Sequence, residues 1–341
     1  MKRKTFLGNL LTGGFAMPAL LSATEEDDTE HKVPPYLHRG DTIAITSPAG
    51  FITVDEVKPA VQQLQDWGYR VRIGETIGKR DGSFGGTDTQ RLQDLQVLID
   101  DPSVKAILCA RGGYGVQRIL DGLSLTRLKD HPKWIIGFSD ITALHLHLQA
   151  HQRISSVHAK MCNSFPDNWE SAEPIVRETI LSLRSLLAGE PMSYMVPPDD
   201  HNRHGKATGL LVGGNLSMIV SCMGTRSEIQ TKGRILFLEE VGEYLYSLDR
   251  MFVNLERAGK LQDLSGLIIG GFNRIKPDDP GEEFGRTLYD IIFEKTKRYK
   301  YPVCFQFPVG HQKNNFALKC GAMHQLTVDA SGSMLKEWRK A

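Results

Sequence analysis

The feature that most constrains this chain is the regular alternation of short apolar segments with amphipathic ones in its first half. Segments typical of strands occupy residues 41–46, 69–73, 104–109 and 134–138, and helical patterns occupy residues 55–67, 90–99, 116–125 and 140–151. Strands that alternate with helices of this length indicate βαβ units and a mainly parallel sheet. We therefore predict an α/β fold with an open parallel sheet over residues 33–175.

A polar connector and a second group of apolar segments follow this predicted sheet. The length of 341 residues corresponds to about two domains. We place the connector at residues 176–206 and a C-terminal domain at residues 207–341, with apolar strands at 235–238 and 267–269. The second half of the chain is therefore expected to fold as a separate unit.

The N-terminus has the layout of an export signal. Residues 2–4 are basic, residues 5–21 carry no charge, and the small residues Ser22 and Ala23 follow. We predict a signal peptide and acidic linker over residues 1–32, with cleavage after Ala23. The mature protein is then expected in the periplasm without a membrane span. A cytoplasmic protein, or one with a disordered or membrane-tethering tail, is the alternative.

Charge and cysteine usage argue against two classes of function. The chain carries 41 basic and 40 acidic residues, a net charge of +1, so nothing favours nucleic-acid binding. Five cysteines occur without a C-x-x-C pair, and neither H-E-x-x-H nor a carboxylate cluster is present. We therefore expect no nucleic-acid partner, no metal and no other cofactor. We expect buried free thiols at Cys109, Cys162, Cys222, Cys304 and Cys320.

Ser139 is the first candidate for chemistry, because it ends an apolar strand and a helical pattern begins directly after it. A serine on such a turn projects its hydroxyl at the carboxyl edge of a parallel sheet, where ligand sites of open α/β sheets lie. The turn resembles a nucleophile elbow, although Ile141 replaces the second glycine of G-x-S-x-G. The alternative is that Ser139 or Asp140 only caps the helix.

A glycine-rich segment, Arg111-Gly112-Gly113-Tyr114-Gly115, follows another apolar strand. Glycines allow backbone N–H groups to approach a ligand closely, so this segment is a candidate phosphate site or oxyanion hole. A P-loop is excluded because no G-K-[ST] follows. A simple glycine turn remains the alternative.

Three carboxylates and one histidine complete the candidates. Glu239 ends the apolar strand 235–238, Glu240 should point to the opposite face, and Glu243 falls on the following turn. A buried carboxylate at a strand end is costly unless it is paired. His311 lies after a glycine at the start of a polar loop, where it could act as a general base. Surface carboxylates and an exposed loop histidine are the alternatives.

Together these segments resemble the LD-carboxypeptidase family of serine peptidases, which includes the microcin C self-immunity peptidases. The matching segments run in family order along nearly the whole chain after the leader. They are residues 40–43 with 47–50, 110–115, 136–144, 213–216, 236–243 and 310–311. One departure is the segment 158–161, His-Ala-Lys-Met, where relatives tend to have glycine and proline between the histidine and the methionine.

The resemblance implies a flavodoxin-like N-terminal domain, a smaller swivelling β/α C-terminal domain and a site between them. It implies a triad of Ser139, Glu239 and His311, with the backbone N–H groups of Gly113 and Asp140 as oxyanion donors. We assign substrate contacts to Arg111, Gly112, Tyr114, Asn215 and His158. Arg111 and Arg250 are the candidates for binding a terminal carboxylate, and a surface or structural salt bridge is the alternative role of Arg250.

The resemblance also implies a serine carboxypeptidase that acts through an acyl-enzyme. Family members cut the L,D-amide bond that holds the terminal D-alanine of murein tetrapeptides. The alternatives are an immunity-type amidase that acts on aminoacyl-nucleotide antibiotics and a murein-fragment binding protein without catalysis. We further expect a homodimer.

Overall fold

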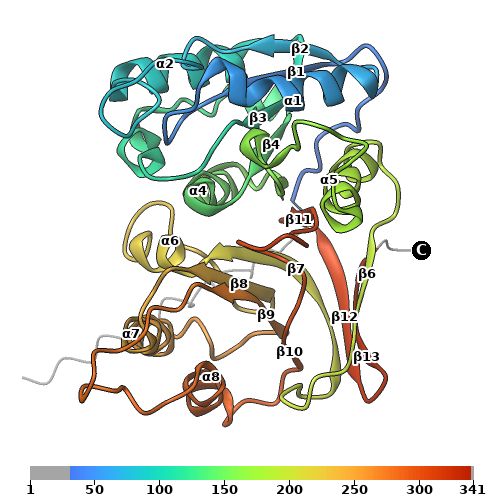
Figure 1. The fold of residues 1–341 in the computed structure, drawn as a ribbon. Coiled ribbons are helices and arrows are strands. Elements are labelled where there is room, and N and C mark those ends of the chain that lie inside the picture. The colour runs from blue at the N-terminus through green and yellow to red at the C-terminus, as the bar shows by residue number, and fades with distance from the viewer. Residues whose placement is uncertain (1–30, 339–341) are drawn as a thin grey trace, which may run out of the picture.

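A computed structural model describes residues 31–338, and all but the last two residues of the predicted signal peptide and acidic linker, residues 1–32, lie outside them. Two sheets organise this part of the chain, the first in the upper lobe and the second in the lower lobe of Figure 1. Within residues 31–338, no helix combines the length and the apolar character needed to cross a bilayer.

The first sheet has five parallel strands in the order β2-β1-β3-β4-β5, with β11 added antiparallel to β5. This parallel order is that of flavodoxin-like folds, so the predicted fold class is confirmed. The strands are β1 (Thr42–Thr46), β2 (Arg70–Ile73), β3 (Val104–Cys109), β4 (Trp134–Gly137), β5 (Ser156–His158) and β11 (Leu318–Cys320).

Helices cover both faces of this sheet. They are α1 (Val54–Asp66), α2 (Asp88–Asp100), α3 (Arg127–Asp130), α4 (Thr142–Gln152) and α5 (Pro174–Leu187). Capping boxes begin α1 and α2, because Thr53 and Thr87 each exchange hydrogen bonds with the residue three positions later. Apolar side chains of α1 and α5 pack with one face of the sheet, and those of α2 and α4 pack with the other.

The helix predicted over residues 116–125 is wrong. Two short 3₁₀ turns, Val116–Arg118 and Leu120–Gly122, stand in its place. The Val116 N–H donates to the Asp140 carboxylate at 2.8 Å, and a Cβ on Gly122 would lie 2.7 Å from the Leu92 side chain. These tertiary contacts fix the segment as tight turns, against its helical apolar pattern.

The second sheet has the strand order β10-β9-β8-β7-β12-β13-β6. The first four strands of that order are parallel and the remaining pairs are antiparallel. The strands are β6 (Ser193–Val196), β7 (Gly205–Asn215), β8 (Ile235–Val241), β9 (Gly266–Asn273), β10 (Val303–Cys304), β12 (Met323–Asp329) and β13 (Gly332–Glu337). The helices of this lobe are α6 (Leu216–Ser221), α7 (Leu245–Arg257) and α8 (Leu288–Thr296).

The two lobes share one apolar core at the point where α4 meets α6 and β8. Leu144 of α4, Ile219 of α6 and Leu236 of β8 belong to the same buried cluster. Gly214 permits this close approach, because a Cβ there would lie 2.5 Å from the Thr142 hydroxyl oxygen. The start of α4 therefore faces the carboxyl ends of β7 and β8.

All five cysteines are buried and free, as predicted. Burial raises the pKa of each thiol, to about 11 for Cys304 and about 12 for Cys320. Because the thiolate is the reactive form, these side chains serve as small apolar packing groups.

Candidate active site

Ser139 occupies a strained turn between β4 and α4. Its φ of +63° makes it one of four non-glycine residues with positive φ in residues 31–338. A side chain rarely adopts this region unless the surroundings enforce it, and such strain gathers at functional sites. No side chain caps the start of α4 by hydrogen bonding, so the alternative role of Ser139 as a helix cap is wrong.

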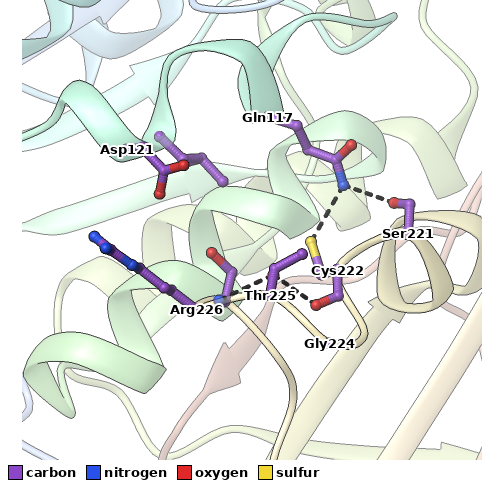
Figure 2. A pocket seen from close by; sticks show the side chains of 9 residues that line it. Gln117, Asp121, Ser221, Cys222, Gly224, Thr225 and Arg226 are labelled. Atoms are coloured by element: carbon purple, nitrogen blue, oxygen red, sulfur yellow. Dashed lines mark hydrogen bonds between the residues drawn. The ribbon is translucent and has the colours of Figure 1, made fainter.

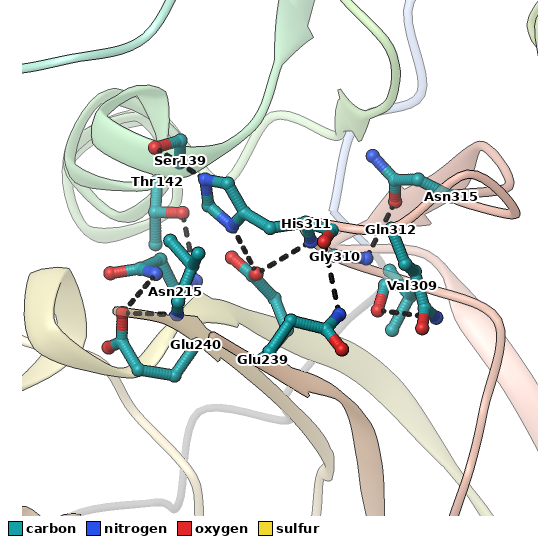
Figure 3. Close-up of polar contacts among 12 residues, drawn as sticks. Ser139, Thr142, Asn215, Glu239, Glu240, Val309, Gly310, His311, Gln312 and Asn315 are labelled. Carbon is teal, nitrogen blue, oxygen red and sulfur yellow. Dashed lines mark hydrogen bonds and ion pairs between the residues drawn. The ribbon is translucent and has the colours of Figure 1, made fainter. Parts of the chain in front are cut away.

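His311 connects Ser139 to Glu239 across the two lobes (Figure 3). Its Nε2 lies 3.1 Å from Ser139 Oγ, and its Nδ1 lies 2.7 Å from Glu239 Oε2. The Nδ1–H can donate to Glu239, which leaves the Nε2 lone pair facing the serine hydroxyl. The arrangement is that of a nucleophile, a general base and a carboxylate that orients the base.

The carboxylate end of this chain is buried and the histidine is partly open to solvent. The Glu239 side chain is 0% exposed and that of His311 is 21% exposed. Glu239 Oε2 also accepts the backbone N–H of His311 at 3.2 Å, so one oxygen receives both donors of the histidine. The ring of Phe138 packs against the His311 ring, with centroids 4.9 Å apart.

Gly310 begins the loop of residues 310–315, the histidine loop, and brings it against Glu239. Its φ is +106°, and a Cβ at this position would lie 2.5 Å from the Glu239 Cβ. The Gly310 N–H donates to the Asn315 side chain at 2.8 Å, and the Asn273 side chain donates to the His311 carbonyl at 3.0 Å. The sequence analysis missed Asn273 and Asn315. For Asn273 the available signal was a polar residue at the end of an apolar strand, the same signal that marked Glu239.

Glu240 points to the opposite side of β8, as predicted. Its carboxylate accepts from the Asn215 amide at 3.0 Å and from the backbone N–H groups of Ser217 at 2.7 Å and Val241 at 2.8 Å. Glu240 thereby holds the start of α6, and its carboxylate forms no hydrogen bond with His311. Glu243 contributes its backbone carbonyl to Lys276 N–H at 3.0 Å.

The glycine-rich segment after β3 lies directly against the serine. A Cβ on Gly112 would sit 2.9 Å from the Ser139 Cβ, so only glycine fits there. Gly113 has a φ of +103°. The buried Asp140 carboxylate accepts the Val116 N–H and so ties this segment to the serine turn. Burial raises the Asp140 pKa to about 6.

Two of the five predicted substrate contacts, Arg111 and Tyr114, are exposed side chains of this segment. Arg111 is exposed and donates to the Phe51 carbonyl at 3.2 Å. Tyr114 is exposed and its ring lies 5.7 Å from that of Phe84. Both side chains are therefore accessible from solvent.

The other three predicted contacts, Gly112, Asn215 and His158, are buried. The Asn215 side chain donates to Glu240 and caps α6, so its polar atoms already have protein partners. His158 is 0% exposed, and its ring lies 5.6 Å from that of Phe138 and 5.2 Å from that of Phe237. Burial holds the His158 pKa well below its usual value, so the ring is neutral.

A separate polar cavity of about 520 Å³ lies between the 3₁₀ turns of the first lobe and the end of α6 (Figure 2). Gln117 crosses it, donating to Ser221 Oγ at 2.6 Å and contacting Cys222 Sγ at 3.2 Å. The remaining lining residues are Leu120, Asp121, Gly224, Thr225, Arg226 and Ser227. None of the residues lining this cavity carries an aromatic ring.

Within residues 31–338, no group of three or more histidine, cysteine or acidic side chains is placed to hold a metal ion. The polar side chains at Ser139, His311 and Glu239 lie within hydrogen-bond distance of one another. The chemistry that this arrangement offers is nucleophilic attack by a serine assisted by a histidine.

Fold and site together define a two-lobed serine-type peptidase. Family models for the LD-carboxypeptidase N-terminal domain and the LD-carboxypeptidase C-terminal domain match residues 43–159 and 208–326. The chain belongs to the LD-carboxypeptidase family.

Relatives with similar sequences carry names from murein chemistry. The chain is 32% identical over 298 residues to a probable murein peptide carboxypeptidase of Bacillus subtilis, covering 85% of this chain and 89% of the relative. It is 32% identical over 287 residues to the murein tetrapeptide carboxypeptidase of Pseudomonas aeruginosa, covering 82% and 91%.

Solved structures agree with the fold. The muramoyltetrapeptide carboxypeptidase from Oxalobacter formigenes superposes with a TM-score of 0.78 at 27% identity, covering 87% of this chain and 99% of the other. The microcin C7 self-immunity protein MccF, in complex with aspartyl sulfamoyl adenosine, superposes with a TM-score of 0.79 at 22% identity, covering 90% and 98%. At that identity the likeness to MccF extends to the fold alone.

Proposed function

We propose that the protein is a serine LD-carboxypeptidase that releases the terminal D-alanine of murein tetrapeptide. The observation that carries this proposal is the continuous contact from Ser139 Oγ through His311 to Glu239. The chain is also similar over most of its length to a murein tetrapeptide carboxypeptidase. The bond to be cut is the amide that joins the carbonyl carbon of the preceding L-centre to the nitrogen of the terminal D-alanine.

In the proposed mechanism, His311 Nε2 removes the proton from Ser139 as the serine oxygen attacks the carbonyl carbon of the L-centre. The buried Glu239 holds the Nδ1–H and stabilises the imidazolium that forms. His311 then returns the proton to the D-alanine nitrogen, the C–N bond breaks and an acyl-enzyme remains. Water, deprotonated by His311, hydrolyses the ester and regenerates Ser139.

We assign the developing oxyanion to the backbone N–H groups of Gly113 and Asp140. Gly112 supports this assignment, because the absence of a side chain brings the glycine-rich segment against Ser139. Preorganised donors of this kind contribute on the order of 10²–10³ to turnover in other serine hydrolases. We also place the exposed Arg111 and Tyr114 among the substrate contacts.

A peptide substrate is favoured over an aminoacyl nucleotide by the relatives. The murein tetrapeptide carboxypeptidase of Pseudomonas aeruginosa is 32% identical to this chain, whereas the likeness to MccF, at 22% identity, extends to the fold alone. A binding protein without catalysis is disfavoured, because the three triad side chains lie within hydrogen-bond distance of one another.

The decisive experiment is incubation of the purified protein with murein tetrapeptide, followed by mass spectrometry of the products. We expect tripeptide and free D-alanine from the wild type. We expect no turnover from Ser139→Ala, which removes the hydroxyl and leaves the fold intact by circular dichroism. Turnover above a few per cent in a folded Ser139→Ala variant would exclude Ser139 as the nucleophile.

We further propose that the protein is exported to the periplasm after cleavage near Ala23 and that it forms a homodimer. The order of basic, uncharged and small residues in the first 23 positions supports export. Strand β6 supports self-association, because it forms a sheet edge and Met195 on it is 78% exposed. N-terminal sequencing from the native host tests the first proposal, and light scattering on a sizing column tests the second.

A further inference from the structure

Lys160 is a partly buried ammonium group at the junction of the two lobes. It lies two residues after β5. Its Nζ donates to the Gln312 carbonyl at 2.8 Å. A lysine ammonium has three N–H donors, so this contact leaves two of them available.

Lys160 differs from the other buried lysines in its partners. Lys260, Lys295 and Lys319 each form an ion pair with a carboxylate, at 2.5, 2.6 and 2.7 Å. Lys133 donates to two carbonyl groups. Within the part of the chain that the structure describes, no carboxylate lies within ion-pair distance of Lys160.

An unpaired cation out of full contact with water is unfavourable. Burial accordingly lowers the Lys160 pKa to about 8. An incoming carboxylate would supply the missing partner and favour the charged form. The cost of keeping this group unpaired in the free protein points to a ligand rather than to a stabilising role.

Lys160 lies beside the triad, because one of its neighbours follows His311 and another flanks the serine. Gln312, its hydrogen-bond partner, directly follows His311. On the other side, Met161 flanks the serine, because a Cβ on Gly112 would lie 3.1 Å from Ser139 Oγ and 3.4 Å from Met161 Cε. Lys160 therefore lies between the histidine loop and the segment that borders the nucleophile.

Strand geometry directs the side chain toward the second lobe. His158 packs against Phe237 of the second lobe, whereas Ala159 belongs to the core beneath α1. Side chains alternate along an extended chain, so Lys160 returns to the face that His158 occupies. Its contact with Gln312 agrees with this direction.

We propose that Lys160 binds the terminal carboxylate of the peptide substrate and so restricts the enzyme to the last residue of the chain. The inference rests on the proposed carboxypeptidase function, in which the leaving D-alanine carries a free carboxylate that an ammonium group can pair with. Arg111 is less suited to this role, because it is exposed and its guanidinium donates to the Phe51 carbonyl.

The test compares two tetrapeptides that differ only at the C-terminus, one with the free acid and one with a carboxamide. The wild type should prefer the acid by on the order of 10–100-fold in kcat/KM, as the energy of a charge-assisted hydrogen bond implies. Lys160→Met and Lys160→Gln should reduce this preference to a few-fold, mainly by raising KM for the acid. Lys160→Arg should retain most of it.

Lys313→Met is the matched control, because Lys313 directly follows Gln312 in the loop that Lys160 contacts, is 67% exposed and pairs with Glu173. It should leave the acid preference unchanged. If the folded Lys160→Met and Lys160→Gln variants lose turnover equally on both peptides, Lys160 only supports the histidine loop and the inference is wrong. If the wild type cleaves neither peptide, the proposed function itself fails, and the assignment of Lys160 fails with it.

Discussion

The first prediction concerns Glu239. Its side chain is fully buried, and one of its carboxylate oxygens accepts both the backbone N–H and the ring Nδ1–H of His311. Glu239→Gln keeps the size of the side chain and removes its charge. The amide can still accept the Nδ1–H of His311 through its oxygen, so part of the population retains the productive tautomer. What it cannot do is neutralise the imidazolium that forms as Ser139 attacks.

The expected loss follows from the Coulomb attraction between these groups. Opposite charges about 4 Å apart attract by about 4 kcal/mol at an effective dielectric constant of about 20. That energy corresponds to a factor of about 10³ in rate. The loss of the orienting charge in serine-protease triads is of similar size. We therefore expect Glu239→Gln to lower kcat by on the order of 10²–10⁴, with KM nearly unchanged.

The assay is steady-state release of D-alanine from tetrapeptide, with Glu240→Gln as the matched control. Glu240 is the neighbouring residue and is also buried, but its carboxylate holds the start of α6. Glu240→Gln should lower the melting temperature more than it lowers kcat. A folded Glu239→Gln enzyme within a few-fold of the wild type, or an inactive Glu240→Gln enzyme of normal stability, would refute the assignment of the triad carboxylate.

Two further predictions concern a backbone position and the pH dependence of stability. Gly310→Ala places a Cβ 2.5 Å from that of Glu239 at a φ of +106°, so kcat/KM should fall at least about 100-fold and the unfolding free energy by about 1–3 kcal/mol. Gly281→Ala, with a φ of +83° and no atom near the added Cβ, isolates the backbone strain and should leave activity intact. Burial lowers the His324 pKa from 6.5 to about 4, so its contribution to stability is present above pH 6.5 and is lost as the pH falls toward 4. Between pH 7 and pH 5 the unfolding free energy measured in urea should therefore fall by about 2 kcal/mol less in His324→Gln than in the wild type. An equal fall in both proteins would contradict a buried neutral ring.

The sequence predicted those features that depend on local pattern and on strand alternation. The strands around 104–109 and 134–137 lie where their apolar runs indicated. Alternation along β8 correctly separated the side chain that meets His311 from the one that meets α6. The order of chemical groups along the chain was sufficient to name the family.

The features that escaped prediction depend on contacts between distant residues. The positive φ of Ser139 was not predicted, because serine rarely adopts this backbone conformation and its identity gives no sign of it. The segment 116–125 has a helical pattern, yet its contact with Asp140 fixes it as turns. His158 was predicted to contact substrate, but its side chain is fully buried and packs against Phe237 from the other lobe.

The antiparallel pairing of β11 with β5 has a consequence for synthesis. Leu318 pairs with His158, although most of the second lobe lies between them in the sequence. The loop that carries His311 runs directly into β11, so the strand that completes the first sheet also brings His311 within hydrogen-bond distance of Ser139. A nascent chain on the ribosome therefore holds Ser139 long before it holds a working site. The peptidase gains its activity in the final steps of translation and folding, when the edge strand closes the first lobe.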